Sequence, residues 1–132
     1  MNTIIEEKFV NTFVIKDKRK RILYELSSTK KRAVALQCLY NVLDKKLIVF
    51  ESLNMSDNEV INEAKNFFEF NKECYIISET TDDGNMLPFE KALKNMLSYE
   101  VNYVIIYDEK TVMVAKEYDT YGMPPKRILQ KA

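Results

Sequence analysis

Two apolar runs near the C-terminal end of the chain, separated by three polar residues, restrict the fold more than any other feature. Residues 101–107 and 111–118 are rich in Val, Ile and Tyr, and Asp108, Glu109 and Lys110 lie between them. A short polar break between two such runs predicts a β-hairpin. The first run is apolar at nearly every position, as is the first half of the second, so other elements should cover both faces. We therefore place this hairpin in the interior of a sheet.

Shorter patterns predict the elements around the hairpin. Apolar residues recur at helical spacing in five segments, and two further apolar runs are typical of buried strands. The helices are expected over about 3–14, 18–26, 30–44, 56–71 and 88–97, and the strands over 47–50 and 74–77. We predict a single α+β domain over residues 1–132. Its sheet is predicted to be mixed and four-stranded, ending in the antiparallel hairpin and covered by about five helices.

Local signals mark several element ends. Thr3 with Glu6, and Ser56 with Glu59, have the spacing of a capping box, in which each side chain satisfies an otherwise unpaired backbone N–H. The C-terminal tail from residue 119 contains one Gly and two Pro and is expected to be extended. Such a tail either covers an edge of its own sheet or binds a partner chain.

The chain contains no histidine. This absence excludes Ser-His-Asp and Cys-His catalysis and every zinc site that needs an imidazole ligand. The two cysteines, Cys38 and Cys74, are too few for a zinc site of four thiolates, and we expect both to be free thiols. No catalytic residue, metal site or cofactor is therefore predicted from a motif.

Charge is balanced overall but unevenly distributed. Twenty basic and twenty acidic residues give a net charge of zero, which is not typical of a general polyanion binder. Residues 1–46 nevertheless hold eleven basic and five acidic residues, and residues 51–100 hold four and eleven. The protein is therefore expected to be electrically lopsided.

The basic residues of the first third form the candidate nucleic-acid-binding set. They are Lys16, Lys18, Arg19, Lys20, Arg21, Lys30, Lys31 and Arg32. A helix, a Ser-Ser-Thr break and a second helix with a basic start loosely resemble a helix-turn-helix. Because the later positions of the second helix are mostly apolar, few polar side chains remain to read base edges. The alternatives are a solvated face and a patch that pairs with the acidic middle third.

Tyrosines near the hairpin form a candidate interaction surface. Alternation places Tyr103 and Tyr107 on the same side of their strand, and Tyr118 and Tyr121 follow. Tyrosine suits interfaces that are part apolar and part wet. The alternative is that these rings belong to the core.

Two acidic segments offer a possible carboxylate- and lysine-based site. Asp82 and Asp83 lie in a polar loop over residues 80–85, and Asp108 and Lys110 lie in the hairpin turn. Acidic and lysine groups together hold metals and activate water in some nucleases. Both segments are more typical of polar turns than of such a site.

Our leading hypothesis is a non-enzymatic binding or protein-interaction module that binds a protein partner or associates with itself as a homodimer. The alternatives are a nucleic-acid-associated protein and a carboxylate- and lysine-based enzyme. No apolar run approaches the ~20 residues needed to cross a bilayer, and the N-terminus lacks the apolar segment of an export signal. We therefore expect a cytoplasmic protein with no membrane partner.

Overall fold

The computed structural model describes residues 1–117 and 125–132. Within them lie five α-helices, six β-strands and three single turns of 3-10 helix. The helices are α1 (Thr3–Phe13), α2 (Arg19–Ser27), α3 (Arg32–Leu39), α4 (Asp57–Ala64) and α5 (Phe89–Tyr99). The strands are β1 (Ile48–Glu51), β2 (Glu73–Ser78), β3 (Met86–Pro88), β4 (Tyr103–Ile106), β5 (Thr111–Ala115) and β6 (Lys126–Gln130).

The described strands form one sheet in the order β1-β6-β5-β4-β2-β3, and all neighbouring strands are antiparallel. The prediction of an α+β protein with about five helices and a central β4–β5 hairpin is confirmed. The prediction of a mixed, four-stranded sheet is wrong, because β3 and β6 add to the sheet and every pair of described strands is antiparallel. The C-terminal tail does more than cover an edge, since β6 inserts between β5 and β1.

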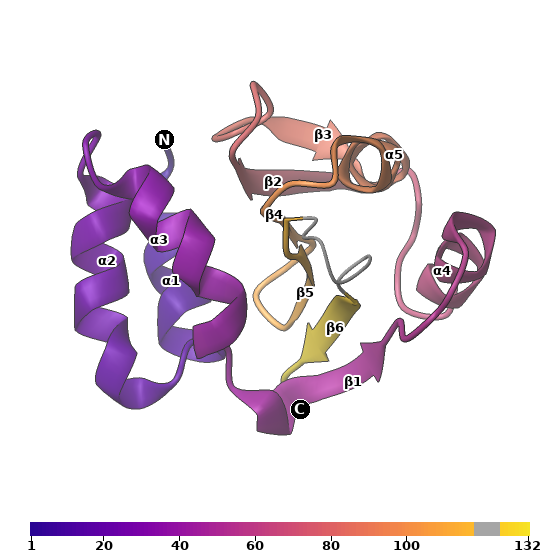
Figure 1. Ribbon diagram of the computed structural model, residues 1–132, viewed down its shortest axis with the longest axis horizontal. Coiled ribbons are helices and arrows are strands. Elements are labelled where there is room, and N and C mark those ends of the chain that lie inside the picture. The colour runs from indigo at the N-terminus through magenta and orange to yellow at the C-terminus, as the bar shows by residue number, and fades with distance from the viewer. Residues whose placement is uncertain (118–124) are drawn as a thin grey trace.

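The sheet is covered on both faces, as the apolar β4–β5 hairpin predicts. Along β2, Tyr75 and Ile77 face one core, and Cys74 and Ile76 face the other. The first core is completed by apolar residues of α1, α2 and α3, and the second by those of α4 and α5. Figure 1 shows the three layers, with α1–α3 on one side of the strands and α4 and α5 on the other.

Helix ends account for several local differences from the prediction. The capping box of Ser56 and Glu59 is present at the start of α4. At α1, however, the N-cap is Asn2, whose Oδ1 accepts a hydrogen bond from Ile5 N at 3.1 Å. Glu6 is unavailable for a box with Thr3 because its carboxylate is buried among other partners.

The third and fourth helices end earlier than the apolar spacing indicates. α3 ends at Leu39 and continues as one 3-10 turn, Tyr40–Val42. α4 ends at Ala64, beyond which Phe68 stacks on Phe89 of α5 with 4.2 Å between ring centroids. Aromatic packing between segments thus replaces the last turns of the predicted fourth helix.

Candidate functional site

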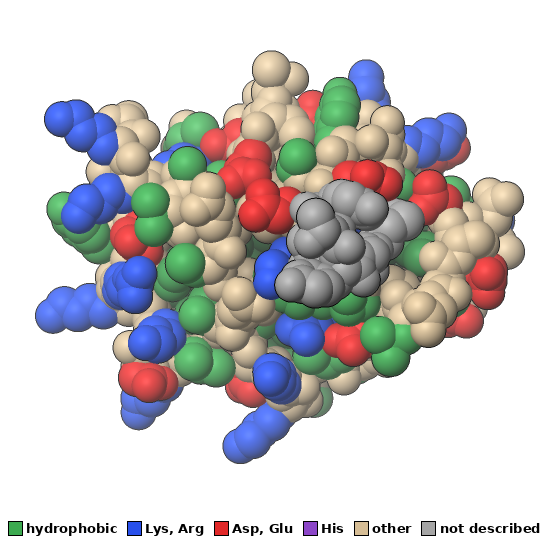
Figure 2. Space-filling model, in the orientation of Figure 1, with side chains coloured by type: hydrophobic (Ala, Val, Ile, Leu, Met, Phe, Trp, Pro, Cys, Tyr) green, Lys and Arg blue, Asp and Glu red, His purple; other side chains and the backbone are tan. Residues whose placement is uncertain are grey.

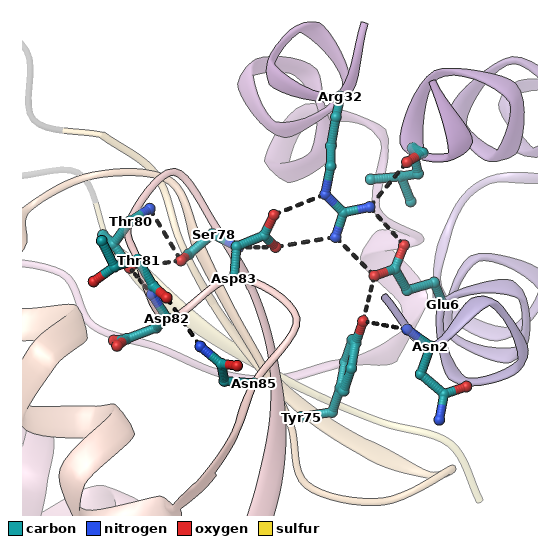
Figure 3. A network of polar contacts seen from close by, with 11 residues as sticks. Asn2, Glu6, Arg32, Tyr75, Ser78, Thr80, Thr81, Asp82, Asp83 and Asn85 are labelled. Atoms are coloured by element: carbon teal, nitrogen blue, oxygen red, sulfur yellow. Dashed lines mark hydrogen bonds and ion pairs between the residues drawn. The ribbon is translucent and has the colours of Figure 1, made fainter. Parts of the chain in front are cut away.

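The most connected polar cluster centres on Arg32, the first residue of α3 (Figure 3). Nη1 and Nη2 donate to the two carboxylate oxygens of Glu6 at 2.7 Å each. Nε and Nη2 donate to Asp83 at 2.8 and 3.0 Å, and Nη1 also donates to Leu26 O at 2.9 Å. All five N–H groups of the guanidinium are therefore engaged.

Burial makes this cluster structural. The side chains of Arg32, Glu6 and Asp83 are only 11%, 6% and 16% exposed. Burial alone would lower the pKa of Arg32, but the hydrogen bonds and charges of Glu6 and Asp83 raise this pKa above its ordinary value. Arg32 is therefore a fixed cation that joins α1, α3 and the β2–β3 loop, and it has no donor left for a phosphate.

Tyr75 extends the cluster to the sheet. Its hydroxyl donates to Glu6 Oε2 at 2.6 Å and accepts from Asn2 N at 2.9 Å. Burial, followed by the hydrogen bond to Glu6, raises the pKa of Tyr75 to about 12. The start of α1 is thereby fixed to β2.

The loop between β2 and β3 holds both helical layers to the sheet through two consecutive aspartates. Asp83 accepts from Arg32 and from Ser78 N at 3.1 Å. Asp82 accepts from Tyr103 Oη at 2.7 Å and from Asn95 Nδ2 of α5 at 2.8 Å. The polar loop predicted over residues 80–85 is thus a two-sided anchor.

The structure does not bring the carboxylate and lysine candidates together. Asp108 Oδ1 accepts from Lys110 N and Thr111 N, each at 2.8 Å, which is turn chemistry. This turn follows the end of β4, whereas Ser78, just before the two-aspartate loop, pairs with the first residue of β4. The two acidic segments therefore lie at opposite ends of β4. Among the described residues no group of three or more possible protein ligands is placed to hold a metal ion.

The eight predicted basic residues separate into two kinds. Arg32 is inside the cluster above, and Arg19 is half-buried with its Nε donating to Val14 O at 2.9 Å. The other six side chains are exposed: Lys16, Lys18, Lys20, Arg21, Lys30 and Lys31. We call these six residues the basic face. Its lysines make no ion pair with another described residue, and Arg21 lies 3.5 Å from Glu25.

Part of the acidic charge in the first third of the chain is buried. Two of the five acidic residues in the first 46, Glu6 and Glu25, are buried. Several acidic residues of the middle third lie on α4 and α5, across the sheet from α1–α3. Figure 2 shows Lys and Arg side chains gathered on the side of the molecule formed by α1–α3. Within the described part of the chain, the contact between Arg32 and Asp83 is the only ion pair between a base of residues 1–46 and an acid of residues 51–100.

The geometry does not support the resemblance to a helix-turn-helix. α3, which would be the recognition helix, begins at the buried Arg32 and packs Ala35, Leu36 and Leu39 into the core. α2 instead lies outermost, beyond α1 and α3 from the sheet (Figure 1). The exposed chemistry of this layer is therefore carried by α2 and the α2–α3 turn.

Tyr24 is a surface residue that the sequence reasoning missed. The buried residues of α2 are Ile22, Glu25 and Leu26, so Tyr24 projects outward and is 60% exposed. The Nζ of Lys31 lies 5.3 Å from the centroid of its ring. The helical spacing of the apolar residues of α2 could have predicted that Tyr24 is exposed.

The structure also changes the interaction surface predicted from the tyrosines near the hairpin. Tyr103 is fully buried, which corrects its assignment to an interaction surface, and burial with the hydrogen bond to Asp82 raises its pKa. Tyr107 is half-buried, with Lys72 Nζ 4.2 Å from its ring centroid. Tyr118 and Tyr121 lie outside the described residues.

Two further features, a cavity and a buried lysine, do not define a site. A cavity of about 180 Å³ opens between α1 and the β4–β5 turn, lined by Phe9, Phe13 and Ile106. At its rim, Glu109 is paired with Lys8 at 2.9 Å. Lys126 on β6 is buried, and burial lowers its pKa. A perturbed lysine alone does not define a reaction.

No protein-family model, no curated protein and no solved structure matches this chain. None of the described helices has the length and apolar character needed to span a bilayer.

Proposed function

We propose that this protein is a non-enzymatic binding protein that holds an anionic partner on the basic face. The observation that carries the proposal is a contrast between carboxylates that are bonded inside the protein and lysines that are exposed. The carboxylates of the Arg32 cluster and the two-aspartate loop are occupied by internal donors. The lysines of the basic face are exposed and unpaired within the described residues. Unpaired surface cations attract polyanions at low ionic strength.

Charge reversal tests this proposal directly. Lys20→Glu combined with Lys31→Glu should weaken retention on an immobilised polyanion such as heparin and lower the salt concentration at which the protein elutes. Lys91→Glu is a matched control, because Lys91 is an exposed lysine on α5, in the opposite layer. If the double variant and the control elute together with the unchanged protein, the basic face is not a binding surface.

Self-association is a second candidate, and one observation favours it. β1 is an edge strand that pairs only with β6 among the described strands. Val49 on this strand is 46% exposed, and Leu53 just after it is 65% exposed. A free strand edge with apolar side chains is a template for pairing with a second chain.

Light scattering coupled to size exclusion tests self-association. A dimer whose population falls in Val49→Lys, with the far-ultraviolet circular dichroism unchanged, supports pairing through β1. A monomer at every concentration tested excludes it. Neither result depends on polyanion binding, so the two candidates are tested independently.

A further inference from the structure

We propose that the partner of the basic face is single-stranded nucleic acid, with an unstacked base lying on the ring of Tyr24 and neighbouring phosphates held by Lys20 and Lys31. This inference rests on the proposed function and assigns its partner class. It also assigns a role to Tyr24 that charge alone does not require.

The placement of Tyr24 is the first step. A large aromatic side chain that is 60% exposed on the outermost helix contributes little to the core. Lys20 lies four residues earlier on α2, so its side chain falls on the same side of the helix. Lys31 reaches the ring from the α2–α3 turn, with its Nζ 5.3 Å from the ring centroid. The ring therefore has one cation over it and a second cation one helical turn away on the same side of α2.

Such an arrangement matches the chemistry of single strands. Proteins that bind single strands combine cations that follow the phosphates with aromatic rings on which bases stack. Every base has a π-face, so a single tyrosine tolerates any sequence. In a duplex the bases are already stacked on each other, and an exposed ring on a helix surface cannot reach their faces.

The geometry also disfavours a duplex for a second reason. Duplex recognition needs polar side chains that reach base edges in a groove. Outward positions of α3 include Ala33 and Val34, and the basic residue that begins this helix is buried in the cluster with Glu6 and Asp83. An acidic protein segment would satisfy the lysines as well as phosphates do, but its carboxylates offer no π-face to stack on the ring of Tyr24.

Fluorescence anisotropy with labelled oligonucleotides tests the inference on the full chain. The probes are an oligo(U) and an oligo(dT) of equal length, a duplex of that length, and a poly-glutamate peptide, each titrated at low and at physiological salt. One or both single strands should bind most tightly. The duplex and the peptide should bind more weakly by about fivefold or more, since one stacked base contributes a factor of about 5 to 150.

Tyr24 variants separate stacking from charge. Tyr24→Ala should weaken single-strand binding by about fivefold or more, and Tyr24→Phe, which keeps the ring, should bind as the unchanged protein does. Tyr99→Ala is the matched control, because Tyr99 is an exposed tyrosine on α5.

Lys20→Glu with Lys31→Glu should weaken binding and flatten its salt dependence, because each lost phosphate contact lowers the slope by about 0.7. Circular dichroism of each variant verifies folding.

The possible failures differ. One failure is that all four probes bind equally, that Tyr24→Ala does not change binding, and that the double lysine variant binds more weakly. This result overturns the single-strand inference and keeps the proposed polyanion-binding function. Tighter binding of the peptide or the duplex than of single strands also overturns the inference. No binding of any probe at low salt overturns both the inference and the proposed function.

Discussion

Arg32 and Glu6 share two hydrogen bonds of 2.7 Å, one from each terminal nitrogen of the guanidinium to each oxygen of the carboxylate. This bidentate pair joins the start of α3 to α1, and the same guanidinium reaches Asp83 in the β2–β3 loop. One side chain therefore connects three segments that are distant in sequence.

Removing Arg32 should destabilise the fold strongly. Arg32→Met leaves the buried carboxylate of Glu6 and the partly buried one of Asp83 without their cation, and breaking a buried pair in this way costs about 3–5 kcal/mol. Urea denaturation followed by circular dichroism measures the loss. Lys30→Met, two residues earlier and exposed, is the matched control and should change stability by no more than about 0.5 kcal/mol. A loss below about 1 kcal/mol for Arg32→Met would contradict the structural role.

Tyr103 should also act through stability rather than through binding. Tyr103→Phe removes the donor to Asp82 Oδ2 while Asn95 remains in place, so the expected cost is about 1–3 kcal/mol for a hydrogen bond to a charged group. Denaturant unfolding measures this change, and Tyr99→Phe at an exposed site should change little. An unaltered stability together with weakened partner binding would restore Tyr103 to an interaction surface.

The sequence predicted what depends on local pattern. The apolar character of β4 and β5 placed this hairpin in the interior, and alternation correctly put Tyr103, Ile105 and Tyr107 on one side, facing the α4–α5 layer. Ser56 and Glu59 predicted the start of α4 because a capping box involves only four consecutive residues.

The sequence did not predict what depends on distant partners. Nothing local distinguishes Arg32 from Lys30 and Lys31, yet only Arg32 meets Glu6 and Asp83 inside the molecule. β6 shows the same limit, since its place between β5 and β1 is set by pairing across the sheet. Strand order and the choice of the buried cation are therefore properties of the tertiary structure.

The two cysteines should differ in reactivity. Cys74 is fully buried, and burial raises its pKa to about 12, so little of the reactive thiolate forms in the native protein. Cys38 is only half-buried on the opposite side of the sheet. Iodoacetamide labelling read by mass spectrometry should modify Cys38 in the native state and Cys74 only in urea. Equal native labelling of both residues would show that the α4–α5 core opens far more readily than its packing indicates.

Alkaline pH should destabilise the protein through its buried tyrosines. Burial raises the pKa of Tyr40 to about 12 despite the nearby charge of Arg127, and burial with the hydrogen bond to Glu6 raises the pKa of Tyr75 to about 12. An unfolded chain releases these protons near pH 10. Between pH ~10 and ~12 the folded state therefore binds more protons than the unfolded state, and linkage requires stability to fall as pH rises.

Substitution isolates this contribution to alkaline unfolding from that of the lysines, which lose their charge over the same range. The double variant Tyr40→Phe, Tyr75→Phe lacks both hydroxyls, so its stability should decline less steeply with pH than that of the unchanged protein. Urea midpoints measured from pH 8 to 12 give the two slopes, and below pH ~9 the difference between the proteins should be constant. Parallel curves up to pH 12 would mean that neither hydroxyl is held protonated by the fold, contrary to the burial of Tyr40 and Tyr75 and to the contact between Tyr75 and Glu6.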